Sequence, residues 1–457
     1  MPPALPDDTS AEAGLAQLFQ PLVAEIAAVS HTRALGRVAG IGRGLVTVAG
    51  LSRAARLGDR VLIGAPGGAR TGGEVVRLDP GEAGVMAEAA LEGTAIGDAV
   101  ELVGRADIFP HDGWIGRVVD GFGQPLDGRP LWRGLTGRPL RAAPPEAVRR
   151  RALGERLATG MAAFDTLLPL VRGQRIGLFA GSGVGKSSLL SSFARGVEAD
   201  VVVIALIGER GRELREFTDK VLGPEGMARA VVVAATSDQS PLLRRRAAWA
   251  AMAAAEHFRD AGRHVLFLCD SITRFAEAHR EVALAAGEVA GLGGWPPSVA
   301  HLIMSLAERA GPGPEGAGDI TAVLSVLVPG SDMEEPVADI LRGVLDGHVV
   351  LDRAIAERGR FPAVDLLRSV SRSLPDCASA EENALIGRAR GLLGAWARAE
   401  LMVQAGLYNA GTDPMVDAAL RAWPGLDGFL AEAAPEGVAA SFARLEAVLA
   451  AAEEGAG

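Results

Sequence analysis

The sequence predicts an α/β fold in which a small N-terminal β-barrel precedes a central domain with a mostly parallel sheet and a C-terminal helical domain. Three changes of pattern along the chain predict this order. Short β-rich runs separated by glycines fill residues 31–100, and apolar strand-like runs alternate with helical stretches over residues 101–372. Only helical patterns follow in residues 373–457, while residues 1–30 form a separate N-terminal segment.

Length and composition narrow the class of protein. A chain of 457 residues can bury the cores of two or three domains. It has no apolar run of about 18 residues, so we expect no membrane span. Its acidic start lacks the basic region of a secretory signal, and two cysteines, Cys269 and Cys377, fit a reducing cytoplasm. The net charge of -10 argues against broad nucleic-acid binding.

The N-terminal segment carries an apolar stripe at helical spacing, which Pro21 would bend or interrupt. The stripe consists of Leu15, Leu18, Phe19, Leu22, Ile26 and Val29. Such a helix either packs on its own domain or docks a partner protein.

The predicted barrel is read from four glycine-bounded runs, none of which contains a metal-binding or catalytic constellation. These runs are "GRVAGIGRGLVTVAGL", "GDRVLIGA", "TGGEVVRLD" and "GDAVELVG". The central domain instead contains continuous apolar runs, which are typical of strands buried on both faces of a parallel sheet. They are "QRIGLFA", "DVVVIALIG", "RAVVVAA", "RHVLFLCD" and "DITAVLSVLV".

The stretch "LFAGSGVGKSSLL" joins the first of these runs to a helical pattern. Its glycines, Gly181, Gly183 and Gly185, allow backbone N–H groups to turn toward an anion, and the following helix adds its positive dipole end. Lys186 would reach the β- and γ-phosphates of a nucleotide, and Ser187 would ligate Mg²⁺. Lys186 is one of only two lysines among 46 basic residues, which indicates a site that needs a compact ammonium.

Two acids follow later strands. Asp270 ends the run "RHVLFLCD", where a carboxylate can hold the water shell of Mg²⁺, although an Asp at this position could also cap the next helix. Glu209 stands just past the earlier run "DVVVIALIG", where it could accept a proton from the water that attacks the γ-phosphate. Arg210 beside it could contact phosphate, or both residues could belong to a charged first helical turn.

Two residues near the end of the central domain complete the candidate set. Phe361 precedes a proline and could stack on a nucleobase. Arg372 ends "SVSR" at the border of the helical domain, where it is either a surface arginine or an arginine that completes the site of a neighbouring subunit.

Together these motifs resemble the type III protein-export ATPases, most of all the flagellar export ATPases, which are relatives of the catalytic subunit of rotary ATP synthases. The resemblance covers about residues 31–425. It is carried by "LFAGSGVGKS", "IGERGRE", "LFLCDSITRFAEAHRE", "WPPSV", "LDGHVVLDRAIAERGRFPAVDLLRSVSR" and "GLYNAGTDPMVDAAL".

The resemblance implies a RecA-like P-loop ATPase core that uses ATP and Mg²⁺. It implies that Glu209 is the catalytic base, that Asp270 and Ser187 serve the metal, and that Arg372 acts across a subunit interface. Arg210 and Arg274 would lie near the phosphates, and Phe361 would stack on adenine. The nucleotide-contacting positions are Ala180, Gly181, Ser182, Gly183, Val184, Gly185, Lys186, Ser187, Ser188, Arg274 and Phe361. Ala180 stands where the strict P-loop pattern has glycine.

The family also implies partners. We expect a homohexamer at the cytoplasmic face of the inner membrane, a central stalk protein, export chaperone–substrate complexes, a membrane export gate, and a regulatory or peripheral-stalk protein on the N-terminal helix. The implied activity is ATP hydrolysis that drives export of flagellar proteins. We expect no specific nucleic-acid partner.

Three other functions share this core. Virulence-type secretion ATPases are so similar in sequence to flagellar export ATPases that one chain hardly separates the two. A rotary ATP synthase subunit is disfavoured because the C-terminal domain has no acidic lever, and Glu209 argues against a non-catalytic subunit. An RNA-translocating helicase would need a basic, aromatic-bearing site, which the barrel lacks.

The glycine-rich loop Ala285 to Trp295 departs from the family pattern and leaves its stalk or substrate contact open.

Overall fold

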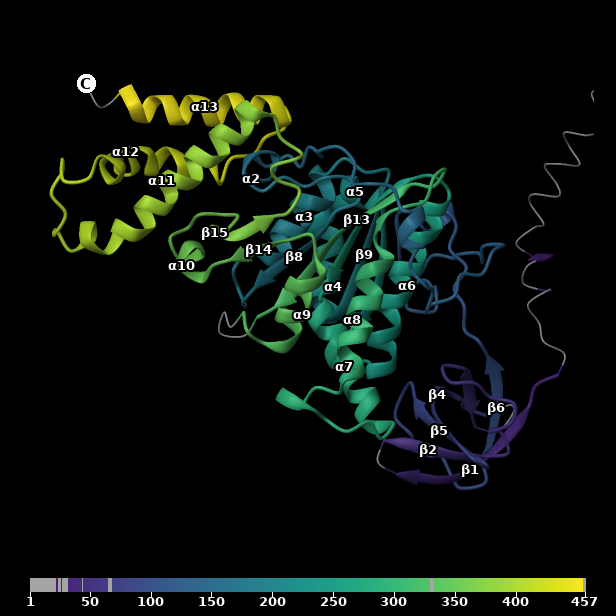
Figure 1. Cartoon of the computed structure of the whole chain (residues 1–457). Helices are drawn as coiled ribbons and strands as arrows, with labels where there is room; N and C mark the ends of the chain where they lie inside the picture. Colours follow the sequence, from purple (N-terminus) through teal and green to yellow (C-terminus); the bar gives the residue numbers. More distant parts are fainter. Residues whose placement is uncertain are drawn as a thin grey trace, which may run out of the picture.

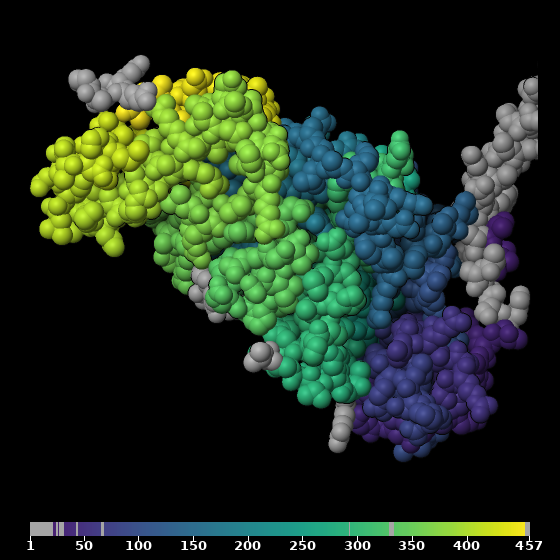
Figure 2. All heavy atoms as spheres, viewed as in Figure 1, coloured from purple at the N-terminus to yellow at the C-terminus, as the bar shows by residue number. Residues whose placement is uncertain are grey.

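The computed structural model arranges the chain in three parts, with the barrel and the helical domain at opposite ends of the central domain (Figure 1). It describes residues 22–23, 26, 32–42, 44–64, 68–328 and 333–454. The predicted N-terminal docking helix lies outside the described residues except for Leu22, Val23 and Ile26, which are exposed. The space-filling view shows the purple barrel in contact with the teal and green central domain (Figure 2).

Six antiparallel strands close the N-terminal barrel in the order β1-β2-β5-β4-β3-β6. Their bounds are β1 Leu35–Gly42, β2 Leu45–Ala49, β3 Arg60–Ile63, β4 Thr71–Asp79, β5 Glu82–Ala87 and β6 Ala99–Gly104. Alternate residues point inward, and a valine core that includes Val46, Val61 and Val85 is fully buried. The predicted small barrel is therefore confirmed, and its last strand extends a few residues past position 100.

The central sheet has the strand order β15-β14-β8-β13-β11-β9-β10-β7, with the short strand β12 paired to β13. Its strands are β7 Arg117–Val119, β8 Arg175–Ala180, β9 Val201–Glu209, β10 Ala230–Thr236, β11 His264–Asp270, β12 Gly311–Pro312, β13 Asp319–Leu327, β14 Gly347–Leu351 and β15 Val364–Ser371. Neighbours pair in parallel except β14 with β15 and β12 with β13. The five apolar runs of the sequence form β8, β9, β10, β11 and β13.

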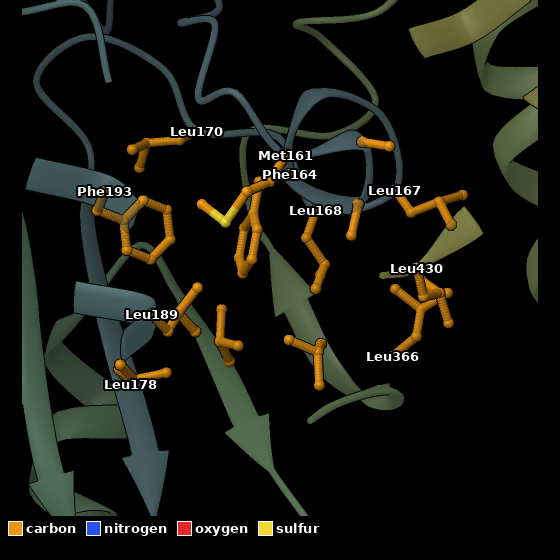
Figure 3. Close-up of a cluster of buried hydrophobic side chains, with 14 of the residues drawn as sticks. Met161, Phe164, Leu167, Leu168, Leu170, Leu178, Leu189, Phe193, Leu366 and Leu430 are labelled. Carbon is orange, nitrogen blue, oxygen red and sulfur yellow. The ribbon is translucent and has the colours of Figure 1, made fainter. Parts of the chain in front are cut away.

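Helices cover both faces of this sheet. They are α2 Ala162–Asp165, α3 Lys186–Gly196, α4 Gly211–Glu216, α5 Gly223–Met227, α6 Pro241–Asp260, α7 Ile272–Ala285, α8 Ser298–Arg309, α9 Pro336–Val344 and α10 Arg353–Glu357. Side chains of β9 alternate between two cores: Val202 and Ile204 share one with α3, while Val203 shares the other with α6. Figure 3 shows the first of these cores, in which Leu178, Leu189 and Phe193 meet. Burial on both faces explains why these strands are continuously apolar.

The C-terminal domain consists of α11 Ala380–Gln404, α12 Pro414–Phe429 and α13 Val438–Glu454. A capping box formed by Ser379 and Glu382 starts α11. Trp396 of α11 stacks on Trp423 of α12 with ring centroids 5.1 Å apart. Phe429 belongs to the same core as β8, so this domain packs directly on the sheet. Within the described part of the chain, no helix is long and apolar enough to cross a membrane.

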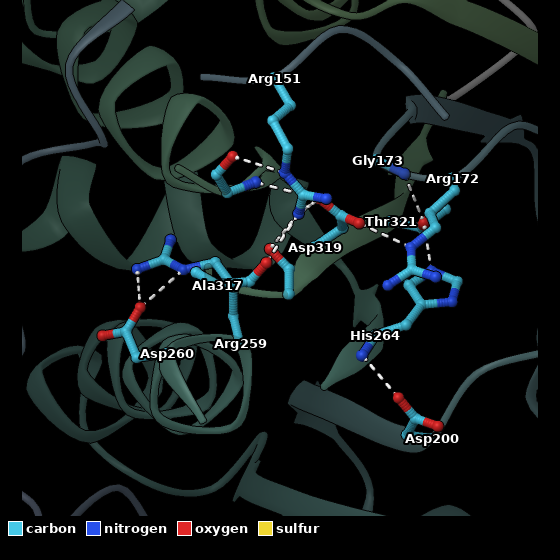
Figure 4. A network of polar contacts seen from close by, with 12 residues as sticks. Arg151, Arg172, Gly173, Asp200, Arg259, Asp260, His264, Ala317, Asp319 and Thr321 are labelled. Atoms are coloured by element: carbon cyan, nitrogen blue, oxygen red, sulfur yellow. Dashed lines mark hydrogen bonds and ion pairs between the residues drawn. The ribbon is translucent and has the colours of Figure 1, made fainter. Parts of the chain in front are cut away.

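A polar network holds the amino ends of the central strands (Figure 4). Arg151 and Arg172 each place a guanidinium nitrogen 2.6 Å from a different carboxylate oxygen of Asp319 at the start of β13. The backbone N–H of His264 at the start of β11 donates to Asp200 over 2.7 Å, and burial lowers the pKa of His264 to about 4. This edge is therefore fixed by ion pairs, while the opposite edge carries the candidate site.

Candidate active site

The glycine-rich loop lies between the end of β8 and the start of α3. Gly183 and Gly185 adopt φ values of 78° and 85°, which a residue with a Cβ seldom reaches. A Cβ on Gly185 would also lie 3.0 Å from the Phe361 ring. Because Gly185 is the N-cap of α3 and offers no side-chain acceptor, the first N–H groups of this helix are left for an anionic ligand.

Ala180 explains how the loop tolerates the loss of its first glycine. It is the last residue of β8 and is 1% exposed. Its carbonyl accepts a hydrogen bond from the N–H of Val328 over 3.0 Å, and it pairs in register with Leu327 and Leu351. An extended strand residue has room for a Cβ, so this position does not require glycine here.

The two acids predicted from strand ends lie beside the loop lysine. Asp270 ends β11 and Glu209 ends β9, and these strands are parallel neighbours. The Lys186 ammonium contacts Oδ1 of Asp270, and its Nζ is 3.8 Å from Oε1 of Glu209. The N-cap of α7 is Ser271, whose hydroxyl accepts from the N–H of Arg274, so Asp270 is not a helix cap.

Sequence reasoning missed one member of this cluster. The Ser325 hydroxyl on β13 is fully buried and donates to Oδ1 of Asp270 over 2.8 Å. This bond and the Lys186 contact both hold Oδ1 of the Asp270 carboxylate. The only signal in the sequence is a hydroxyl residue inside the apolar run "DITAVLSVLV".

The environment of Glu209 moves the pKa of its carboxyl group toward neutral pH. Burial, followed by the negative charge of Asp270, raises the pKa of Glu209 to about 7, and the charge of Lys186 opposes this rise only in part. A carboxyl group with a pKa near neutral pH can accept a proton and release it again during turnover.

This pKa predicts how ATP turnover depends on pH. Glu209 is protonated below pH 7 and cannot act as a base there, so turnover should rise with pH through an apparent midpoint near 7. The measurement is steady-state phosphate release at saturating ATP between about pH 5.5 and 8.5, with folding monitored by circular dichroism. A flat profile over this range, in protein that stays folded, would contradict the assignment of Glu209.

Two cavities flank the loop. One of about 180 Å³ is lined on its polar side by Ser187, Glu209, Glu213 and Asp270. The other, of about 590 Å³, lies between α3, Phe361 and the segment 431–437 of the helical domain. Phe361 is half exposed and its ring faces Gly185. The larger cavity has the size and the aromatic wall that a nucleoside needs, and the smaller cavity carries the acids.

The residues present fit a magnesium ion that is bound together with nucleotide. Among the described residues no cluster of three or more His, Cys, Asp or Glu side chains could hold a metal by itself. Mg²⁺ usually takes one or two protein ligands and fills its octahedron with waters and phosphate oxygens. The Ser187 hydroxyl and the Asp270 carboxylate on one cavity wall supply that kind of donor set.

The three candidate arginines lie at different distances from this cluster. Arg274, in the first turn of α7, packs against Gly208 of β9 and pairs with Glu277 over 2.9 Å. The Arg210 side chain is 74% exposed and pairs with Glu213. The structure therefore places Arg274 beside the end of β9, while the Arg210 guanidinium is largely exposed and paired with Glu213.

Arg372 lies at the opposite end of the sheet strands from the glycine-rich loop. It follows β15, which runs antiparallel to β14, so that Val364 pairs with Leu351 near the loop and Ser371 pairs with Gly347 at the other end. Its backbone N–H donates to Asp346, and Nη2 donates to the carbonyl of Arg342, both over 3.0 Å. The intervening length of β8 is about 17 Å. Arg372 therefore cannot serve the site of its own chain.

The chain is similar in sequence to proteins of two described families. The family model for the nucleotide-binding domain of the ATP synthase alpha/beta family matches residues 160–371, and the model for the T3SS EscN ATPase C-terminal domain matches residues 378–447. The flagellum-specific ATP synthase of Caulobacter vibrioides is 45% identical over 90% of this chain and 94% of its own. The type 3 secretion system ATPase of Xanthomonas euvesicatoria is 45% identical over 70% of this chain and 72% of its own.

Solved structures of type III secretion ATPases are also similar to this chain. The assembled ATPase EscN of the enteropathogenic Escherichia coli type III secretion system superposes with a TM-score of 0.84 at 35% identity, and the match covers 91% of this chain and 100% of that one. The structure of assembled EscN in complex with its central stalk EscO gives a TM-score of 0.82 over the same shares at 35% identity. The similarity thus spans all three parts of the fold.

Proposed function

The chain belongs to the family of flagellum-specific ATP synthases and type III secretion ATPases, and from this premise we propose that it hydrolyses ATP to drive export of flagellar proteins. The observation that carries the proposal is the cluster of Lys186, Glu209 and Asp270 at the carboxyl edge of the sheet, beside the glycine-rich loop. A P-loop that only bound nucleotide would not need a half-buried carboxyl group with a pKa near 7.

Each residue has a role in the proposed site. The N–H groups of the loop from Gly181 to Gly185 and the Lys186 ammonium bind the phosphates, and Phe361 stacks on adenine. Ser187 and Asp270 hold Mg²⁺, which neutralises charge on the phosphate oxygens when it is bound. Arg274, beside the end of β9, adds positive charge near the phosphates. Arg210 would also contact a phosphate once its side chain leaves Glu213.

Glu209 performs the proton transfer. Its carboxylate accepts a proton from a water molecule as the water oxygen attacks the γ-phosphorus and the bond to the ADP oxygen breaks. The proton leaves Glu209 when phosphate is released, which restores the base. Ser325 and Lys186 hold Asp270 in place during these steps, so that the acid next to Glu209 keeps one orientation.

The functional unit of the proposal is a homohexamer. Its support is the position of Arg372, which is exposed at a domain edge and too distant from its own nucleotide site. In a ring, the same arginine can reach the γ-phosphate bound by the neighbouring subunit, as an arginine finger does. The similarity to assembled EscN, which was solved with its central stalk EscO, supports both a ring and a central stalk partner.

The remaining partners follow from the export role. We expect chaperone–substrate complexes to deliver their cargo to this ATPase at the cytoplasmic face of the inner membrane, next to a membrane export gate. The segment 1–30 would dock a regulatory or peripheral-stalk protein. Export is favoured over a rotary synthase role because the C-terminal domain matches the EscN type.

Gene deletion tests the export function. Cells without the gene should lose swimming and the filament protein in the culture medium, and wild-type protein should restore both. A variant with Glu209→Gln, expressed to the same level, should restore neither, because it lacks the base. Intact motility together with loss of effector secretion would instead assign the chain to a virulence-type system.

A further inference from the structure

A cavity of about 680 Å³ lies between the barrel and the central domain, away from the nucleotide site. Its walls come from β4, the segment 141–144 and helices α6, α7 and α8, and it shares no lining residue with the two cavities beside the P-loop. Leu45 and Met86 of the barrel pack against Leu242 and Val282 next to it, so the junction is a formed interface. Figure 1 shows the end of α7 against the barrel.

One end of this cavity carries an excess of positive charge. The Arg245 side chain is 4% exposed, and its Nη2 donates to Oε1 of Glu74 over 2.7 Å. Arg141 donates to the same oxygen over 3.2 Å. Both guanidinium groups lie over the Trp249 ring, at 4.9 Å and 4.3 Å from its centroid. Two cations therefore share one carboxylate, and Nε of Arg245 has no hydrogen-bond partner among the described residues.

Glu288, the acid at the other end, is bonded to Ser298 and makes no ion pair with Arg141 or Arg245 among the described residues. Arg245 can only donate, so Nδ1 of His279 accepts its bond of 3.2 Å, and His279 carries its proton on Nε2. That nitrogen donates to the Ser298 hydroxyl over 2.9 Å, which donates in turn to Glu288 over 2.6 Å. Glu288 also accepts from the backbone N–H of Ser298, so its carboxylate is already satisfied.

The rest of the wall is apolar. Val76 of the barrel, Val282 of α7, and Leu302 and Leu306 of α8 face the same space as the Trp249 ring. A volume of several hundred Å³ with apolar walls and a few convergent polar groups is the usual form of a small-molecule site. Ala286 and Glu288 bring the start of the glycine-rich loop 285–295 into this wall, which gives that loop a contact with the cavity.

We propose that this cavity binds a small organic anion, whose acidic group pairs with Arg141 and Arg245 and whose aromatic or aliphatic body fills the space between Trp249 and α8. The anion supplies the second negative charge that the two guanidinium groups lack. The apolar body replaces water against the valine and leucine side chains, which is favourable.

The test uses 8-anilinonaphthalene-1-sulfonate, an aromatic anion that fluoresces when it leaves water. Full-length protein is titrated with this probe in the presence of saturating ADP, so that the nucleotide cavities are filled. Arg141→Ala should weaken binding about tenfold, since it removes a charge-assisted contact at a half-exposed position. Ala286→Phe, at a residue with ordinary helical φ and ψ, should fill the space and abolish the saturable signal.

Arg133→Ala is the matched control. Arg133 also lies over an aromatic ring, that of Phe109, but it does not line the cavity. The Arg133→Ala protein should bind the probe as tightly as the wild type does. The proposal is overturned if the wild type gives no saturable signal, or if both cavity variants bind as tightly as Arg133→Ala. Thermal midpoints confirm folding of each variant, and if Ala286→Phe fails to fold, the comparison of Arg141→Ala with Arg133→Ala decides.

Discussion

Replacing Arg372 with alanine is expected to reduce ATP turnover by about a thousandfold or more, while nucleotide binding stays close to that of the wild type. In the proposed mechanism the guanidinium group stabilises negative charge that develops on the γ-phosphate in the transition state, so its loss should lower the rate and spare ground-state binding. The residue is exposed, and among the described residues its side chain bonds only to the carbonyl of Arg342, so removing it should not disturb the fold. Phosphate release and binding of a fluorescent ATP analogue measure the two quantities.

Arg368 provides the control for this variant. It lies on β15, and its side chain pairs with Asp352 and Asp365 of its own chain. Arg368→Ala should keep turnover within about twofold of the wild type, as is usual for exposed ion pairs. Equal losses in the two variants would show that β15 has a structural effect, and full activity in Arg372→Ala would remove the arginine from the mechanism.

Glu209→Gln is expected to lower turnover by about a hundredfold to ten-thousandfold without loss of nucleotide affinity. The amide keeps the size of the side chain but cannot accept a proton from water. Because Glu209 is half-buried at the end of β9, an isosteric change should leave the strand and the loop in place. A single-turnover measurement of bound ATP separates this chemical step from product release.

The neighbouring acid serves as the comparison. Glu213 lines the same cavity as Glu209, but it lies on α4 and is more exposed. Glu213→Gln should retain most of the turnover. If Glu209→Gln is as active as Glu213→Gln, the proton goes elsewhere and the assignment of the base is wrong.

Much of the fold could be predicted because burial leaves a direct trace in sequence. The strands β8, β9, β10, β11 and β13 are apolar on both faces, so each stands out as a continuous run. The antiparallel pair β14 and β15 was not predicted. β15 lies at the edge of the sheet and leaves Leu367, Arg368 and Val370 exposed, so its pattern is weaker than that of a buried strand.

The candidate site also has a part that the sequence predicts and a part that it does not. Lys186, Glu209 and Asp270 could be found because each stands at the end of an apolar strand, and the carboxyl ends of parallel strands meet at one edge. Ser325 could not, since a single hydroxyl in a strand has no spacing signal. The cavity at the barrel depends on contacts such as that between Glu74 and Arg245, 171 residues apart, which no local pattern reveals.

The central claim is that Arg372 of one subunit completes the nucleotide site around Lys186 and Glu209 of the next. The most direct test mixes two inactive variants, Arg372→Ala and Lys186→Ala, and measures phosphate release after mixed hexamers are verified by native mass spectrometry. We expect turnover to return, because some interfaces then contain an intact Lys186 and an intact Arg372 from different chains. Verified mixed hexamers that remain as inactive as either parent would contradict the account.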